Sequence, residues 1–141
     1  MEAHVKIYMF ENAINSKKQG DIGMCYAIAF YSKKGWTVSI PVTDSQDYDL
    51  VVDDGDKLLK VQVKTTRSRD AKKKSSPYIV SLRTTGGNKS GQTAKKFTNN
   101  KSDIVFILTD SGELYSIPRV NITSKSFISL GKDKDIYKVS L

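Results

Sequence analysis

The order of apolar and polar positions predicts one amphipathic helix followed by several strands. In residues 21–34 apolar side chains recur at helical spacing, and Gly35 then supplies a typical helix end. Further along, apolar and polar residues alternate, which is typical of half-buried strands. The buried stripe of the helix is expected to comprise Ile22, Cys25, Ile28, Ala29 and Ser32. The expected strands are residues 36–42, 48–53, 57–66, 78–84, 103–109 and 113–117.

The segments between these elements indicate how they connect. A turn around Gly55 joins the second and third strands as a hairpin, and a turn around Gly112 joins the last two. Residues 91–100 are compatible with a further short helix. The sequence shows no internal repeat and no long linker. We therefore expect an α/β or α+β fold, a central mixed β-sheet flanked by helices, in one domain spanning residues 1–141.

The first hairpin places polar residues together on one face of the sheet. A two-residue loop at 55–56 sets Asp49 opposite Gln62 and Asp47 opposite Lys64, so that all four share a face. A loop one residue earlier would shift the pairing by two residues and keep the same side chains on that face. The opposite face is apolar and suited to the core, and it carries Leu50, Val52, Val61 and Val63.

The charge of the chain favours a polyanionic partner. Its formal net charge is +8 and its isoelectric point is near 9.5, and many of the basic residues lie among Ser, Thr, Asn and Gly between positions 57 and 101. Cationic side chains attract phosphates, while hydroxyls and backbone amides donate hydrogen bonds to them. Nucleic acid is the expected partner, although a solvated face would also explain the basic run at 72–76. The expected DNA contacts are Lys17, Lys18, Thr65, Arg67, Arg69, Lys72, Lys73, Lys74, Arg83, Lys89, Lys95 and Lys96.

Cysteine and histidine content argues against several classes of protein. Cys25 is the single cysteine and lies in an apolar stretch, so we expect it to be buried rather than reactive. With His4 as the single histidine, zinc binding and Cys/His catalysis are not expected. The sequence has neither a membrane-length apolar run nor the pattern of a signal peptide, which predicts a cytoplasmic protein with no membrane partner.

An acid, an amide and a lysine on one face suggest metal-assisted phosphodiester hydrolysis. Asp49 would hold Mg²⁺, with the Gln62 side-chain oxygen and the backbone carbonyl of Val63 as further ligands. Lys64 would orient the attacking water and stabilise charge on the phosphate. The alternative is an exposed hairpin whose cross-strand pairs each contribute only ~0.2–1 kcal/mol.

The same residues resemble a known nuclease signature. Asp49, followed later by Gln62-Val63-Lys64, resembles the D-(x)n-(E/Q)-x-K pattern of the PD-(D/E)XK nuclease superfamily. The stretches GDIG at 20–23, GWTV at 35–38 and GELYSIP at 112–118 are similar to small endonucleases associated with group I introns, which share the QxK variant.

This resemblance implies a fold, a reaction and an assembly. It implies a restriction-endonuclease-like core with the site at one edge of the sheet, and catalytic roles for Asp49, Gln62 and Lys64. It further implies a homing-type endonuclease that cleaves double-stranded DNA with Mg²⁺, for which Mn²⁺ can substitute. The protein would act as a homodimer or homotetramer and would be encoded by a phage or another mobile element.

One position departs from the pattern of that family. Its members usually carry a glutamate directly after GDIG, where this chain has Met24, and a thioether is a poor substitute for a carboxylate on Mg²⁺. Asp21, Asp47 or the more distant Glu11 could supply the missing charge. Otherwise the chain is a catalytically impaired DNA-binding relative. A Holliday-junction resolvase-like nuclease and a protein-interaction domain with a merely solubilising basic face are the remaining alternatives.

Overall fold

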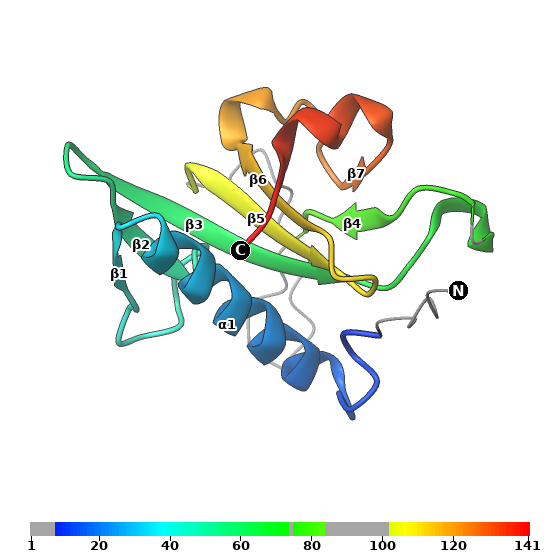
Figure 1. Ribbon diagram of the computed structural model, residues 1–141, viewed down its shortest axis with the longest axis horizontal. Coiled ribbons are helices and arrows are strands. Elements are labelled where there is room, and N and C mark those ends of the chain that lie inside the picture. The colour runs from blue at the N-terminus through cyan, green and yellow to red at the C-terminus, as the bar shows by residue number, and fades with distance from the viewer. Residues whose placement is uncertain (1–7, 74, 84–101) are drawn as a thin grey trace, which may run out of the picture.

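The computed structural model describes residues 8–73, 75–83 and 102–141, which form a long helix and two sheets (Figure 1). The helix is α1 (Ser16–Lys33). The strands are β1 (Thr37–Ser39), β2 (Leu50–Asp53), β3 (Leu58–Thr66), β4 (Ile79–Ser81), β5 (Ile104–Thr109), β6 (Leu114–Pro118), β7 (Phe127–Ser129) and β8 (Lys138–Val139). Short 3-10 helices are η1 (Asp70–Lys72), η3 (Arg119–Asn121) and η4 (Lys132–Tyr137).

The larger sheet is mixed, as the sequence predicted. Its six strands lie in the order β1-β2-β3-β5-β6-β8, and β4 and β7 form a separate two-stranded sheet. The pair β3–β5 is parallel, while the other pairs of both sheets are antiparallel. The two longest strands of the structure, β3 and β5, are therefore both interior strands of the larger sheet.

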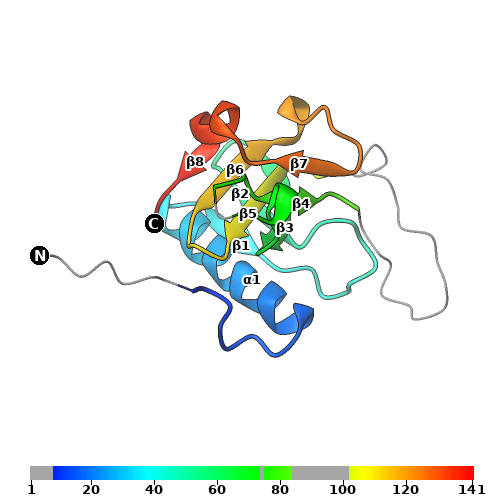
Figure 2. The same cartoon turned by 90° about the vertical axis from the view of Figure 1, so that its right-hand side faces the viewer.

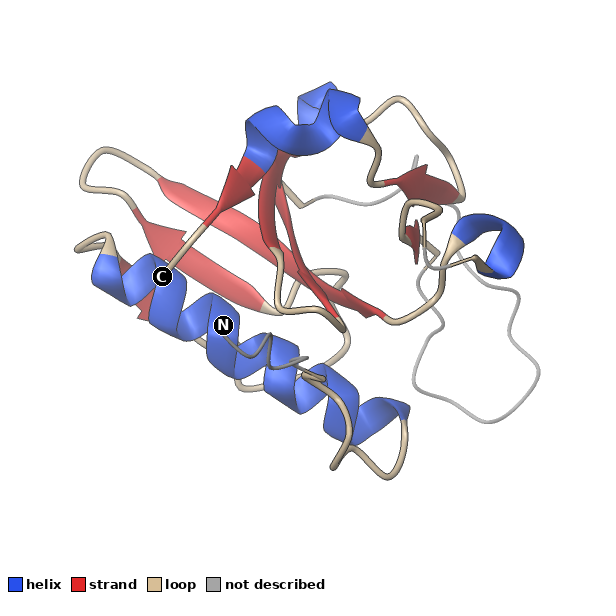
Figure 3. Ribbon diagram, turned by 45° about the vertical axis from the view of Figure 1, so that its right-hand side comes forward, coloured by secondary structure: helices blue, strands red, loops and turns tan. Residues whose placement is uncertain are grey.

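Each face of the larger sheet is covered by a different layer. Figure 2 shows α1 below the sheet and β7 above it, and Figure 3 shows α1 lying along the strands with the short helices on the other side. The α1 side buries Phe10, Ala27, Phe30, Tyr31, Leu50, Val52, Val61, Phe106, Leu108 and Leu114. The other side buries Tyr78, Val80, Leu82, Val105, Ile107, Tyr115, Ile117, Ile122, Ile128 and Leu130. The interior strand β5 contributes to both cores, because its alternate side chains face opposite layers.

The helix differs from the expectation in its start and in its buried face. It begins at Ser16 rather than at residue 21, because the Asn15 side chain accepts a hydrogen bond from the Lys18 backbone N–H at 2.9 Å and caps the first turn. Cys25 and Ala29 are exposed, so the expectation of a buried cysteine was wrong. The residues of α1 that are buried are Gly23, Ala27, Phe30 and Tyr31.

Small residues explain this change of face. A Cβ atom added to Gly23 would lie 2.4 Å from Thr65 Cγ2 and 3.3 Å from Val63 Cγ1, so the helix backbone itself touches β3 here. The pattern of hydrophobic residues does not reveal this contact, because it depends on glycine having no side chain. The helix is therefore rotated so that glycine and alanine, rather than Ile22 and Cys25, approach the sheet most closely.

Most predicted strands are present, and several are shorter than expected. Strand β1 ends at Ser39, and the apolar Ile40 and Val42 beyond it are 58% and 103% exposed. Strands β7 and β8 were not predicted, since each is at most three residues long and depends on a distant partner strand. The short helix expected at 91–100 lies outside the described residues. Within the described parts of the chain, no helix is both long and apolar enough to span a membrane.

Candidate active site

The register of the β2–β3 hairpin is the one predicted for a loop at 55–56. Leu50 pairs with Val61 and Asp53 with Leu58. The regular pairing ends at Leu50, because the Asp49 backbone N–H donates to the carbonyl of Val61 instead of continuing the register to Gln62. Gly55 at the turn has a φ of +100°, a value that glycine tolerates and other residues avoid. The register predicted for residues 50–53 is therefore confirmed, whereas Asp49 lies outside the regular ladder.

Asp49 directly precedes the first residue of β2, at the point where β3 extends past that strand. Its backbone N–H donates to the Val61 carbonyl at 2.8 Å, although Val61 is paired with Leu50, so the chain departs from the regular ladder here as in a β-bulge. Its carboxylate then accepts a hydrogen bond from the Val63 backbone N–H, with 2.7 Å between N and Oδ2. The carboxylate therefore takes the place that a further β2 residue would occupy, and it is held against the open edge of β3.

The carbonyl of Val63 faces the same open edge. In a strand, the N–H and C=O of one residue point to the same neighbour, so the Val63 carbonyl lies on the side of its N–H and hence of Asp49. This open edge belongs to β3, an interior strand whose later residues extend past its partner β2.

Gln62 and Lys64 project from the face of β3 opposite α1. Val63 and Thr65 meet Gly23 of the helix, so the alternate residues point to the other side. Gln62 is 3% exposed, and the Lys64 side chain is half-buried with its Nζ donating to the Arg83 carbonyl at 3.1 Å. That bond ties the lysine to the chain just after β4.

Asp49 and Lys64 influence each other's charge. Although Asp49 is exposed as a residue, partial removal of its carboxylate from water raises its pKa, while the Val63 hydrogen bond and the Lys64 charge lower it. Burial lowers the pKa of Lys64, and the Asp49 charge opposes that shift. The two groups are thus close enough to interact in surroundings that disfavour an isolated charge.

Replacing Lys64 with methionine is expected to raise the pKa of Asp49 further in the metal-free protein. The substitution removes the positive charge that favours the ionised carboxylate and leaves the burial that disfavours it, so the proton is held to a higher pH. NMR titration of the Asp49 carboxyl carbon measures this shift. Lys57→Met, which removes the same charge at the hairpin turn, is the control and should leave the Asp49 pKa unchanged. An equal Asp49 pKa in wild type and Lys64→Met would contradict the pairing.

The auxiliary acids that the sequence suggested are spread over several elements. Asp21 is exposed on α1, Glu11 is exposed before it, and Asp47 is half-buried in the loop before β2. Met24 is half-buried and packs with the core on the α1 side, whereas Gln62 and Lys64 face away from α1. In the described part of the chain, no three Asp, Glu, His or Cys residues gather to form a metal-binding cluster.

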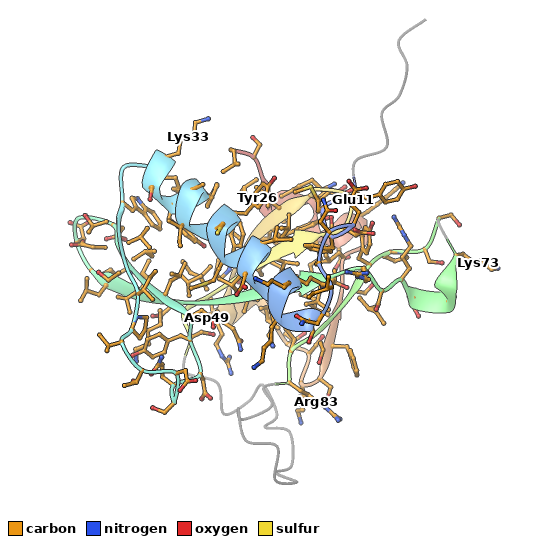
Figure 4. The ribbon with its side chains drawn as sticks, turned by 90° about the horizontal axis from the view of Figure 1, so that it is seen from below. Glu11, Tyr26, Lys33, Asp49, Lys73 and Arg83 are labelled. Carbon is orange, nitrogen blue, oxygen red and sulfur yellow. The ribbon has the colours of Figure 1, made fainter. Side chains whose placement is uncertain are left out.

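The basic residues predicted to contact DNA fall into separate places. Lys17, Lys18 and Arg67 are exposed near the start of α1 and the end of β3, and Arg83 is exposed after β4. In Figure 4, Lys73 lies far from Asp49, whereas Arg83 is on the Asp49 side of the view. Thr65 is half-buried on β3, and Lys72 belongs to η1. Lys74, Lys89, Lys95 and Lys96 lie outside the described residues.

Two of these positions have structural partners that sequence reasoning missed. The Arg69 guanidinium lies 4.0 Å from the centre of the Tyr78 ring and donates to the Ser76 carbonyl at 2.7 Å, so it already secures the loop around η1. Gln19 on α1 donates to Thr65 Oγ1 at 2.8 Å and accepts from Arg67 Nε at 3.0 Å. Nothing in the local sequence around Gln19 signals a contact with residues so distant along the chain.

The chain is similar to known endonucleases in sequence and in fold. Residues 14–135 match the sequence profile of the PD-(D/E)XK endonucleases. The chain is also similar to a bacterial homing endonuclease of known structure, I-Ssp6803I, with 32% sequence identity and a TM-score of 0.68. That similarity covers 84% of this chain and 79% of the other. Among curated protein sequences, none matches this chain.

Proposed function

We propose that this chain, which belongs to the PD-(D/E)XK endonuclease family, is a divalent-metal-dependent endonuclease that hydrolyses phosphodiester bonds in double-stranded DNA. The observation that carries the proposal is the Asp49 carboxylate, held by the Val63 N–H at the open edge of β3 and electrostatically coupled to Lys64. Catalytic roles for Asp49, Gln62 and Lys64 follow from this arrangement.

The oxygen donors at this edge suit a hard cation. An ionised carboxylate has about four lone-pair sites, so Asp49 retains acceptor capacity after its bond to Val63. The Val63 carbonyl lies on the same side of β3, and the Gln62 amide oxygen would be a third donor. Mg²⁺ takes oxygen ligands and typically keeps several waters, so a small protein donor set is sufficient. When bound, Mg²⁺ or Mn²⁺ would stabilise negative charge that develops on the phosphate.

Lys64 would hold the remaining reactants in place. An ammonium group has three donors, and one of them is used on the Arg83 carbonyl. The others can bind the attacking water or a phosphate oxygen. Because the side chain is partly desolvated, its charge acts through a lower effective dielectric than in bulk water and stabilises a phosphate more strongly.

Cleavage of supercoiled plasmid DNA tests the proposal. Nicked and linear products should form with Mg²⁺ or Mn²⁺ and disappear with EDTA. Cleavage that continues undiminished after removal of divalent ions would contradict metal dependence. A parallel assay on linear duplex and four-way junctions separates a homing-type enzyme from a junction-resolving one, since the same catalytic residues serve both.

The structural relative favours a homing-type substrate. That protein is a bacterial homing endonuclease, and we infer that this chain is likewise a homing-type endonuclease and is carried by a mobile element. Cutting both strands requires two sites, which a homodimer or homotetramer would supply. Sedimentation of the protein with and without duplex DNA measures the assembly.

A DNA-binding protein with weak or absent cleavage is the second candidate, and Met24 favours it. The side chain packs with apolar neighbours on the α1 side and offers no oxygen to a metal. This candidate predicts salt-dependent duplex binding together with little or no plasmid nicking at any metal concentration.

Replacing Gln62 with glutamate is expected to make the thermal stability of the protein depend more strongly on Mg²⁺. The side chain at this position is almost fully buried, so a new carboxylate near Asp49 adds an uncompensated charge and lowers the melting temperature in EDTA. Mg²⁺ should then restore stability by a larger shift than in wild type, because it binds the folded state more tightly. Melting curves across a Mg²⁺ titration measure both effects. Asn121→Asp, the same chemical change at an exposed position, is the control, and equal Mg²⁺ shifts in all three proteins would exclude Gln62 from the metal site.

A further inference from the structure

A groove continues from the candidate active site along the end of β3. It has a volume of about 330 Å³, at the lower end of the range for ligand pockets, ~300–1,000 Å³. Gln19 of α1 lines one side, and Ser81 and Phe127 of the β4–β7 pair line the other. Thr65, Arg67 and Ser68 form its floor where β3 leaves the sheet. The groove therefore lies on the strand that carries Lys64, between the two layers that cover the sheet.

Arg67 brings a fixed and uncompensated positive charge to this groove. Its Nε donates to Gln19 Oε1 at 3.0 Å, and one terminal nitrogen donates to the Phe10 carbonyl at 3.4 Å. The guanidinium carbon lies 5.7 Å from the centre of the Phe10 ring. These partners are all neutral, and within the described ranges no carboxylate pairs with Arg67. The side chain is thus oriented without losing its charge, and a guanidinium has five donors, of which two are engaged.

The remaining lining suits one unit of a nucleic-acid backbone. Ser68 and Ser81 supply hydroxyl groups, which commonly donate to phosphate oxygens. Phe127 is 53% exposed and offers an apolar wall to a sugar or an unstacked base. The groove holds a cation and neutral donors with no acidic side chain in its lining, which is the combination that selects an anion.

We propose that this groove binds a backbone phosphate of the cleaved DNA strand next to the cut, with Arg67 as its ligand and Gln19 as the residue that positions Arg67. The proposal rests on the proposed function, since it assumes that DNA is the substrate. Lys64 and Arg67 are three residues apart, about 10 Å along an extended strand, and successive phosphates of one DNA strand advance ~3.4 Å along the helix axis. The two side chains leave the strand on different sides, Lys64 away from α1 and Arg67 towards Gln19 of α1, so a phosphate at Arg67 would be a neighbour of the one at Lys64 and not the same phosphate.

Salt-dependent binding to a 30-base-pair duplex of arbitrary sequence tests the groove. Each phosphate contact contributes about 0.9 to the slope of log K against log salt. Arg67→Met keeps an apolar stem against Phe10 and is expected to reduce the slope by about 0.9, which corresponds to roughly tenfold weaker binding at ~0.1 M salt. Lys57→Met removes the same charge at the hairpin turn and is expected to leave the slope unchanged.

A second pair of variants avoids the packing around Arg67. Ser81 is exposed on β4, so Ser81→Asp places a negative charge in the groove without disturbing α1, and Ser81→Asn adds similar bulk without charge. Only the aspartate should reduce affinity and slope. If wild type binds normally and the slope is unchanged in both Arg67→Met and Ser81→Asp, the groove does not bind a phosphate. That result would not affect the proposed endonuclease activity. A slope reduced equally by Lys57→Met also overturns the proposed phosphate site, and a wild type that binds no duplex overturns both proposals.

Discussion

Replacing Asp49 with asparagine is expected to lower DNA cleavage by ~10²-fold or more, the scale on which removal of one transition-state-stabilising group acts, while the fold remains intact. Asparagine keeps an oxygen in place to accept the Val63 N–H. It lacks the negative charge that would hold a divalent cation and that supports the ionised form of Lys64. Initial rates of plasmid nicking over a Mg²⁺ titration, with melting temperature measured in parallel, give the result.

Two further variants make this experiment specific. Asp49→Ala also leaves the Val63 N–H without its partner, so it should lose activity and in addition about 1 kcal/mol of stability. Asp53→Asn makes the same change on the same hairpin, where the side chain accepts from the Gly55 N–H at 2.9 Å, and it should cleave normally. Full activity of Asp49→Asn at saturating Mg²⁺ would remove Asp49 from the catalytic site.

The second large effect is expected from a single methyl group at Gly23. The Cβ of Gly23→Ala would lie 2.4 Å from Thr65 Cγ2, far inside van der Waals contact. Thr65 cannot simply turn away, because its hydroxyl accepts a hydrogen bond from Gln19. The helix must therefore move off β3, and we expect a loss of about 1–3 kcal/mol in the free energy of unfolding. Cleavage should fall as well, since Val63 and Thr65, which lose their contact with the helix, flank Lys64 on β3.

A matched control lies one turn earlier on the same helix. A Cβ added to Gly20 meets nothing within 4 Å, so Gly20→Ala should gain about 0.5–1 kcal/mol from the better helix propensity of alanine. Urea unfolding of both variants measures the difference. If the two alanine variants were equally stable, α1 would not touch β3 at Gly23 in solution.

The parts of the site that the sequence predicted are those set by local geometry. The register of the β2–β3 hairpin follows from a tight glycine turn and from strand alternation, so it needed no knowledge of other elements. The bonds of Asp49 to Val61 and Val63, which depart from that register, were not predicted. The mixed sheet followed from the order of helical and alternating segments. In contrast, the buried face of α1 was predicted wrongly, because the closest contact is made by Gly23, whose importance lies in what it lacks.

Contacts between distant segments were beyond sequence reasoning. The Gln19–Arg67 hydrogen bond joins residues 48 positions apart, and the Lys64 bond to the Arg83 carbonyl depends on where the chain leaves β4. Arg69 and Arg67 have similar sequence surroundings, yet one stacks on Tyr78 and the other faces the groove. Charge and spacing identify a basic segment. Which partner each arginine contacts depends on how β4 and α1 pack around it.

The unpaired end of β3 also bears on self-association. A strand that extends past its neighbour presents free backbone groups to which another chain can add a strand, and proteins commonly block such edges with charged side chains. The Asp49 carboxylate occupies the Val63 N–H at this position, so it opposes edge-to-edge aggregation whether or not DNA is ever cut. An acid at this position therefore limits the addition of a further strand independently of any role in binding metal.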